Sequence, residues 1–132
     1  MALLHDPLFS LDTPRYLGLG TLGFIVAHEI MHGFDSAGVE FDDQGRRSGL
    51  LSAESQRTFE EKMKCLSSQF SDTFQTEFLH NGTGIILKVD GELTLNENVA
   101  DLGAVKAIVA TQKRLAKEHG QDLNLPGLSY TQ

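Results

Sequence analysis

The sequence predicts a mainly α-helical protein in which three helices pack together, with at most a short pair of strands. Three observations support this fold class. Apolar residues recur three or four positions apart along 53–79, as they do on one face of a long helix. Two other stretches, Phe24–Asp35 and Thr94–Gly120, also have helical character, and both end at glycines or turn-forming residues.

The first predicted helix follows an extended segment and begins near Thr13 and Pro14, with Asp12 or Thr13 as N-cap. Glycine in a helix interior costs about 1 kcal/mol relative to alanine. Three glycines precede the stretch Phe24–Asp35, and they predict either close packing against another element or a break: Gly18, Gly20 and Gly23.

The second helix is predicted from Ala53 to about Leu79, after a polar loop over 36–52 and with Ser52 as N-cap. Its apolar stripe is expected to face the core: Phe59, Met63, Leu66, Phe70, Phe74 and Phe78. The opposite face is expected to be wet: Glu60, Lys64, Ser67 and Ser71. Turn signals at Asn81-Gly82 and Asp90-Gly91 then flank a predicted strand over Ile85–Val89.

Composition narrows the possible functions. The 132 residues suffice for one domain at most, and 40% hydrophobic with 22% charged residues is ordinary for a soluble chain. A net charge of −7 argues against a nucleic-acid partner and against an anionic membrane surface. We expect no signal peptide and no membrane segment, because the start is not basic and the apolar runs are short. Cys65 is the only cysteine, so an internal disulfide is excluded.

The stretch Phe24–Asp35 contains His28, Glu29 and His32 in the pattern His-Glu-x-x-His. On a helix, residues four apart lie on one face, so two imidazoles can reach one metal ion. Glu29 lies roughly 100° further round the helix and can act on a metal-bound water as a base. The alternative is a pair of solvated or core histidines, but the apolar flanks favour a metal, because ionisable groups in a core need partners.

A zinc site needs a third ligand, and one elongated zinc pattern is excluded because Gly38 stands where its third histidine would be. The best candidate is Glu97, with Asp101 four residues later on the same face. Asp101 can accept the ring N–H of a ligating histidine. Thr94-x-x-Glu97 is also a capping-box pattern, so local sequence leaves capping and metal binding both open for Glu97. Asp101 and the distant histidine motif favour the metal.

These motifs, HEIMHGFD and ENVADLG, resemble the signatures of the neprilysin and endothelin-converting-enzyme family of zinc metallopeptidases, with Ala104 in place of a final glycine. The resemblance extends over most of the chain. It implies zinc ligands at His28, His32 and Glu97, a catalytic base at Glu29, and a supporting or proton-donating role at Asp101. It also implies that 1–132 is the helical portion of a thermolysin-like catalytic domain.

The resemblance further implies peptide substrates and an extracellular or plasma-membrane ectodomain. Family members usually pair the cysteine that matches Cys65 with one far upstream, and they carry a tryptophan pair near the end of the loop over 36–52; both are missing here. Substrate-binding and transition-state residues known in the family also fall outside this chain.

Three functions therefore remain. The first is a zinc-dependent endopeptidase with Glu29 as general base, and the second is a truncated zinc-binding remnant with little or no activity. The third is a helical interaction module without metal.

Overall fold

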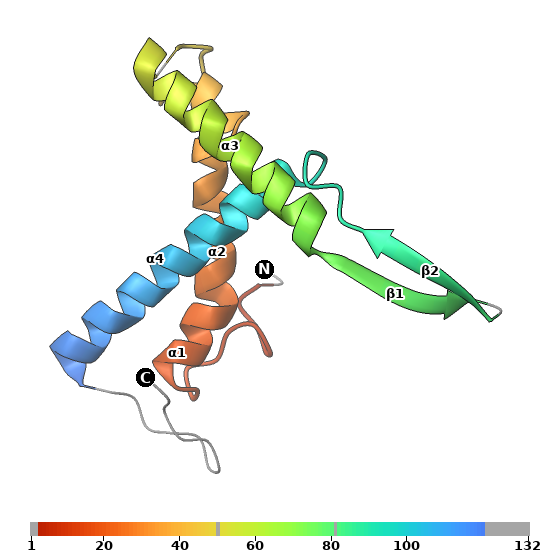
Figure 1. The fold of residues 1–132 in the computed structure, drawn as a ribbon. Coiled ribbons are helices and arrows are strands. Elements are labelled where there is room, and N and C mark those ends of the chain that lie inside the picture. The colour runs from red at the N-terminus through yellow and green to blue at the C-terminus, as the bar shows by residue number, and fades with distance from the viewer. Residues whose placement is uncertain (1–2, 50, 81, 121–132) are drawn as a thin grey trace. The chain divides into compact units, whose positions relative to one another are not determined.

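The structure is a computed structural model that describes residues 3–49, 51–80 and 82–120, without the side chains of 77–80. Its elements are α1 (Arg15–Gly18), a π-helical turn (Leu19–Gly23), α2 (Phe24–Met31), 3-10 turns (His32–Phe34 and Gly38–Glu40), α3 (Ala53–Thr73), β1 (Gln75–His80), β2 (Thr83–Lys88) and α4 (Leu95–His119) (Figure 1). The mainly α fold with one short strand pair is confirmed.

The chain divides into two compact units. The first unit comprises Met1–Met31 and Asp101–Gln132, and the second comprises His32–Ala100. The boundaries fall between the two histidines of the motif and between Ala100 and Asp101. Each unit is therefore described separately.

The first unit contains a helical run that starts at Arg15, with Pro14 as N-cap rather than the predicted Asp12 or Thr13. The three glycines do not break this helical run. Among the described residues, close packing is found at Gly23 but not at Gly18 or Gly20. Within the described part of the chain, nothing lies within 4 Å of a Cβ built on Gly18 or Gly20, whereas one on Gly23 would lie 3.3 Å from the Gly18 carbonyl oxygen. Gly18 ends α1, and Gly20 and Gly23 lie in the π-helical turn that continues the run into α2.

The run Arg15–Phe34 is long and apolar enough to cross a membrane by length and composition alone. The core helix of a soluble protein passes the same test. The expectation that the chain has no membrane segment therefore stays a prediction.

The apolar flanks of the motif are less buried than expected. Val26 and Ile30 are 50% and 63% exposed, and α2 contains no buried residue. Within the first unit, α2 approaches α4 closely at Gly103, where a Cβ would clash with the Met31 side chain. The remaining apolar face borders an open groove of about 610 Å³, whose lining includes Phe9, Leu22, Val26, Ile30, Ile108 and Leu115.

In the second unit, α3 begins as predicted, with the Ser52 hydroxyl accepting a hydrogen bond from the Ser55 N–H. The predicted end near Leu79 is wrong, because the helix stops at Thr73 and Phe74 is extended. The chain continues into β1, which pairs antiparallel with β2 from Gln75↔Lys88 to His80↔Thr83 (Figure 1). Pairing with β2, in which Ile85 and Ile86 are β-branched, favours this hairpin over further helix. The segment that carries Phe74 and Phe78 is therefore not part of the helical stripe.

The predicted wet face of α3 is also only partly correct. Glu60 and Lys64 are exposed, but Ser67 and Ser71 are half-buried. The reason is Gly91, whose N–H donates to the Ser71 hydroxyl at 2.9 Å and whose missing side chain allows close approach to the Ser67 carbonyl.

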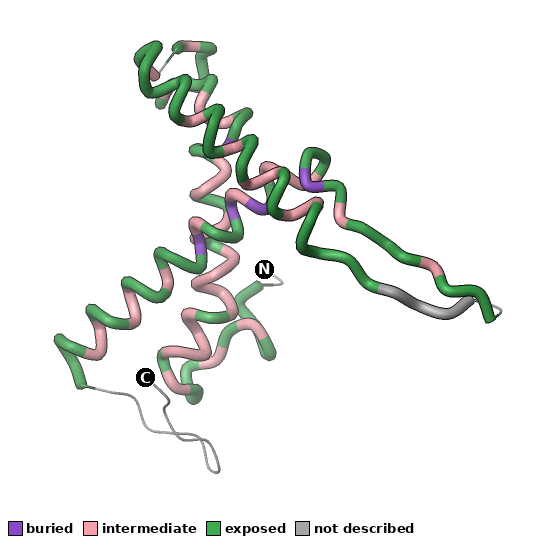
Figure 2. The backbone as a smooth tube through the Cα atoms, viewed as in Figure 1, coloured by how far each residue is buried: buried purple, intermediate pink, exposed green. Residues whose placement is uncertain are grey.

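The buried residues of α4 are Asn98, Ala100 and Ala104, and they lie in its N-terminal half (Figure 2). Ala100 and Ala104 are fully buried, whereas the larger apolar residues Leu102 and Val109 are 41% and 45% exposed. Gly120, with φ of 78°, follows the helix end as predicted.

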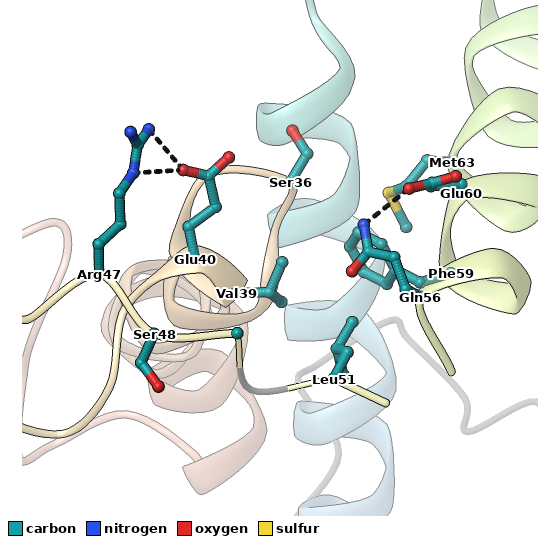
Figure 3. A pocket seen from close by; sticks show the side chains of 11 residues that line it. Ser36, Val39, Glu40, Arg47, Ser48, Leu51, Gln56, Phe59, Glu60 and Met63 are labelled. Carbon is teal, nitrogen blue, oxygen red and sulfur yellow. Dashed lines mark hydrogen bonds and ion pairs between the residues drawn. The ribbon is translucent and has the colours of Figure 1, made fainter. Parts of the chain in front are cut away.

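Within the predicted loop, residues 36–49 and 51–52 are irregular apart from the short 3-10 turn and a bridge between Phe41 and Arg47. It forms one wall of an open hollow of about 520 Å³ in the second unit (Figure 3). An ion pair between Arg47 and Glu40 lies on the loop side of this hollow, and Phe59 lies on the α3 side.

Candidate metal centre

The first unit places His28 in α2 beside a carboxylate of α4. The Nδ1 atom of His28 lies 2.9 Å from Oδ1 of Asp101. The imidazole is 16% exposed and the carboxylate 53% exposed. A carboxylate on Nδ1 fixes the ring orientation and favours the tautomer in which Nε2 has a lone pair for a metal. Glu29 follows His28 in the same helix and is exposed.

The second unit gives His32 a comparable partner that sequence reasoning missed. Its Nδ1 lies 2.8 Å from Oδ2 of Asp35, whose side chain is only 5% exposed. The other oxygen of Asp35 accepts hydrogen bonds from the N–H groups of Ala37 and Gly38, at 2.9 and 2.7 Å. A glycine is required at Gly38, because a Cβ there would clash with the His32 carbonyl oxygen.

Burial alone would raise the pKa of the Asp35 carboxyl. Hydrogen bonds from Gly38, His32 and Ala37, together with the charge of His32, outweigh burial and hold this pKa below its usual value. Asp35 is therefore a carboxylate at neutral pH and can accept the Nδ1–H of His32. The sequence signal for this role is an aspartate three residues after a histidine, at a helix end followed by a turn.

Glu97 lies in the first turn of α4, with its Oε1 3.7 Å from Nε2 of His32. Its side chain is 66% exposed. The capping-box alternative is not the observed arrangement: the Thr94 N–H donates to the Asp90 carbonyl at 3.0 Å, and the Thr94 hydroxyl accepts from Asn98 at 2.8 Å. The Glu97 carboxylate therefore lies near the His32 ring, while the Thr94 N–H is bonded to Asp90.

The donor set fits zinc. Imidazole nitrogen and carboxylate oxygen are common zinc ligands, and both histidines have a carboxylate on Nδ1. His32 and Glu97 lie together in the second unit, while His28 precedes His32 by four residues along one helical run. All five site residues predicted from the sequence lie in described parts of the chain.

Comparison with known proteins identifies the family of the chain. The model of peptidase family M13 matches residues 1–131. The chain is 34% identical to Neprilysin-2 of Drosophila melanogaster and 36% identical to Membrane metallo-endopeptidase-like 1 of Mus musculus, each over 129 residues. These matches cover 98% of this chain but 16% of each relative.

Solved structures give the same result. A zinc metalloprotease of Mycobacterium tuberculosis in complex with an inhibitor matches with a TM-score of 0.72 and 27% identity, over 86% of this chain and 17% of that one. PepO from Lactobacillus rhamnosis matches with a TM-score of 0.69 and 29% identity, over 83% and 16%. The resemblance drawn from the two motifs is confirmed, and the chain belongs to peptidase family M13.

Proposed function

We propose that this chain carries the zinc centre of a metalloendopeptidase and that His28, His32 and Glu97 hold one zinc ion. The observation that carries the proposal is the pairing of His32 with Glu97, 65 residues later in the chain, at 3.7 Å between Nε2 and Oε1. Two ligand-type atoms from distant segments meet there, and the partner of His32 on Nδ1 is a carboxylate. Membership of a peptidase family gives the reaction class.

Each residue has a distinct task in the proposed hydrolysis of a peptide bond. When bound, zinc would lower the pKa of a water ligand towards about 7 and polarise the substrate carbonyl. Glu29, which follows His28 in α2, takes the proton from the attacking water. Asp101 and Asp35 hold the rings of His28 and His32. Asp101 also assists proton transfer, as its resemblance to the family position implies.

A second candidate is a zinc-binding remnant with little or no peptidase activity. The observation that favours it is the exposure of Val26 and Ile30, 50% and 63%, on the motif helix. Peptide substrates and an extracellular or ectodomain location are proposals by family resemblance. Asn81, which with Gly82 and Thr83 also matches a glycosylation acceptor sequence, lies outside the described residues.

Zinc content tests the metal site directly. The purified chain should bind about one zinc ion, and His28→Ala or His32→Ala should abolish binding, because each removes one of three protein ligands. Asp101→Ala should weaken affinity about 10–100-fold. Near-stoichiometric zinc in either histidine variant would refute the site.

Cleavage of a quenched peptide then separates the two candidates. The enzyme hypothesis predicts cleavage that a chelator abolishes and added zinc restores. The remnant hypothesis predicts bound zinc without cleavage.

A further inference from the structure

A second pair of side chains joins the segment after His32 to the start of α4. Both the N–H and the hydroxyl of Ser36 donate to Oδ1 of Asn96, the N–H at 3.3 Å. Ser36 is exposed and Asn96 half-buried. Both residues lie in the second unit.

The two ends of this contact are one residue away from groups already placed at the metal centre. Ser36 follows Asp35, which is bonded to His32, and Asn96 precedes Glu97. The hydrogen bonds of Ser36 therefore connect the turn that orients His32 with the helical turn that carries Glu97.

Such a connection matters because zinc ligation is demanding in distance. Zinc binds imidazole nitrogen and carboxylate oxygen at about 2.0–2.2 Å, and a plausible site holds these distances within about 0.2 Å. Glu97 is mostly exposed and lies on the first turn of α4, where backbone N–H groups have no partners within the helix. A side-chain anchor beside it restricts movement of this helix end relative to His32.

We infer that Asn96, through Ser36, is a positioning residue that sets the distance between Glu97 and His32. The inference rests on the proposed zinc site. It assigns to Asn96 a task that differs from ligation and from catalysis, and it predicts that the contact affects metal affinity more than folding.

The test measures zinc affinity by chelator competition and the visible absorption of the Co²⁺-substituted chain. Asn96→Ala and Ser36→Ala should each weaken zinc binding about 10–100-fold, as loss of a supporting partner does. The Co²⁺ spectrum should change in both, because the Glu97 oxygen is no longer held in place. Ser36→Thr keeps the hydroxyl and should restore affinity.

Two controls isolate the contact. Thr58→Ala removes a hydroxyl that bonds to the Glu54 carbonyl at 3.2 Å within α3, and it should leave zinc affinity unchanged. The double variant of Asn96 and Ser36 should bind zinc about as weakly as Asn96→Ala alone, because Asn96→Ala already removes both hydrogen bonds from Ser36.

The outcomes distinguish a failure of this inference from a failure of the proposed zinc site. If Glu97→Ala loses zinc but Asn96→Ala binds with parental affinity, the inference is wrong and the site stands. A parental Co²⁺ spectrum in Asn96→Ala, with reduced stability of the metal-free chain, would show a merely structural role and also overturn it. If the parent chain binds no zinc, the proposed site and this inference both fail.

Discussion

The Nδ1 atom of His32 lies 2.8 Å from Oδ2 of Asp35, a carboxylate with 5% of its side chain exposed. The same carboxylate closes the turn after the motif by accepting from Ala37 and Gly38. One buried group thus orients a proposed ligand and completes the backbone turn next to it.

We expect Asp35→Ala to weaken zinc affinity about 10–100-fold and to destabilise the metal-free chain as well, because Ala37 and Gly38 lose their acceptor. Competition with a chelator measures the first effect, and urea unfolding without metal measures the second. Asp101→Ala is the matched comparison, since Asp101 is 53% exposed and should affect folding less. Equal zinc affinity in Asp35→Ala and the parent would contradict the orienting role.

The stability of the fold should depend on pH in the acidic range through the carboxyl group of Asp42. The Arg46 N–H lowers the pKa of Asp42, desolvation opposes this, and the Arg46 side chain and Gln44 N–H lower it further. An aspartate whose folded pKa lies below its unfolded value of about 3.9 stabilises the fold above that pH. The stabilisation is lost as the pH falls through the folded pKa.

Carboxyl ¹³C shifts measured by NMR across the acidic range should place the pKa of Asp42 below that of an unfolded peptide. Arg46→Met removes only the side-chain bonds, so it should raise this pKa partly towards the unfolded value. The backbone bond, the largest cause of the shift, remains. An unshifted Asp42 in the parent chain would refute the observed turn.

The contact of Gly91 with α3 predicts a cost for any side chain at that position. Gly91→Ala should lower the free energy of unfolding by about 1–3 kcal/mol, because the added methyl meets the Ser67 backbone and the Ser71 hydroxyl. Gly49→Ala is the control, since no atom of the described residues lies within 4 Å of a Cβ there and the change should be nearly neutral. Urea unfolding of both variants checks this, and equal stability would argue against the close approach.

The sequence predicted the parts of this fold that depend on local signals. Helical periodicity located α3 and α4, the Ser52 cap marked the start of α3, and Gly120 marked the end of α4. The end of α3 could not be located in the same way. Phe74 continues the helical spacing, and only pairing with β2, a non-local interaction, favours extended structure there.

The candidate site was predictable where spacing within one helix decides the chemistry, as for His28, Glu29 and His32. Asp35 was missed because its partner bonds depend on the 3-10 turn that follows His32. The local sequence around Glu97 could not distinguish a capping box from metal binding. The structure favours approach to His32 because the Thr94 N–H is bonded to Asp90, which the sequence pattern does not indicate.

The central claim is that Glu97 is a zinc ligand and Glu29 a base. Bound zinc measured side by side in Glu29→Gln and Glu97→Ala tests it most directly, and zinc-dependent melting gives a second readout. Glutamine cannot accept the proton, so Glu29→Gln should keep the metal and lose any hydrolysis. Glu97→Ala should lose the metal and the stability that zinc confers. If Glu97→Ala instead binds as much zinc as Glu29→Gln with similar affinity, Glu97 is not the third ligand and the account is wrong.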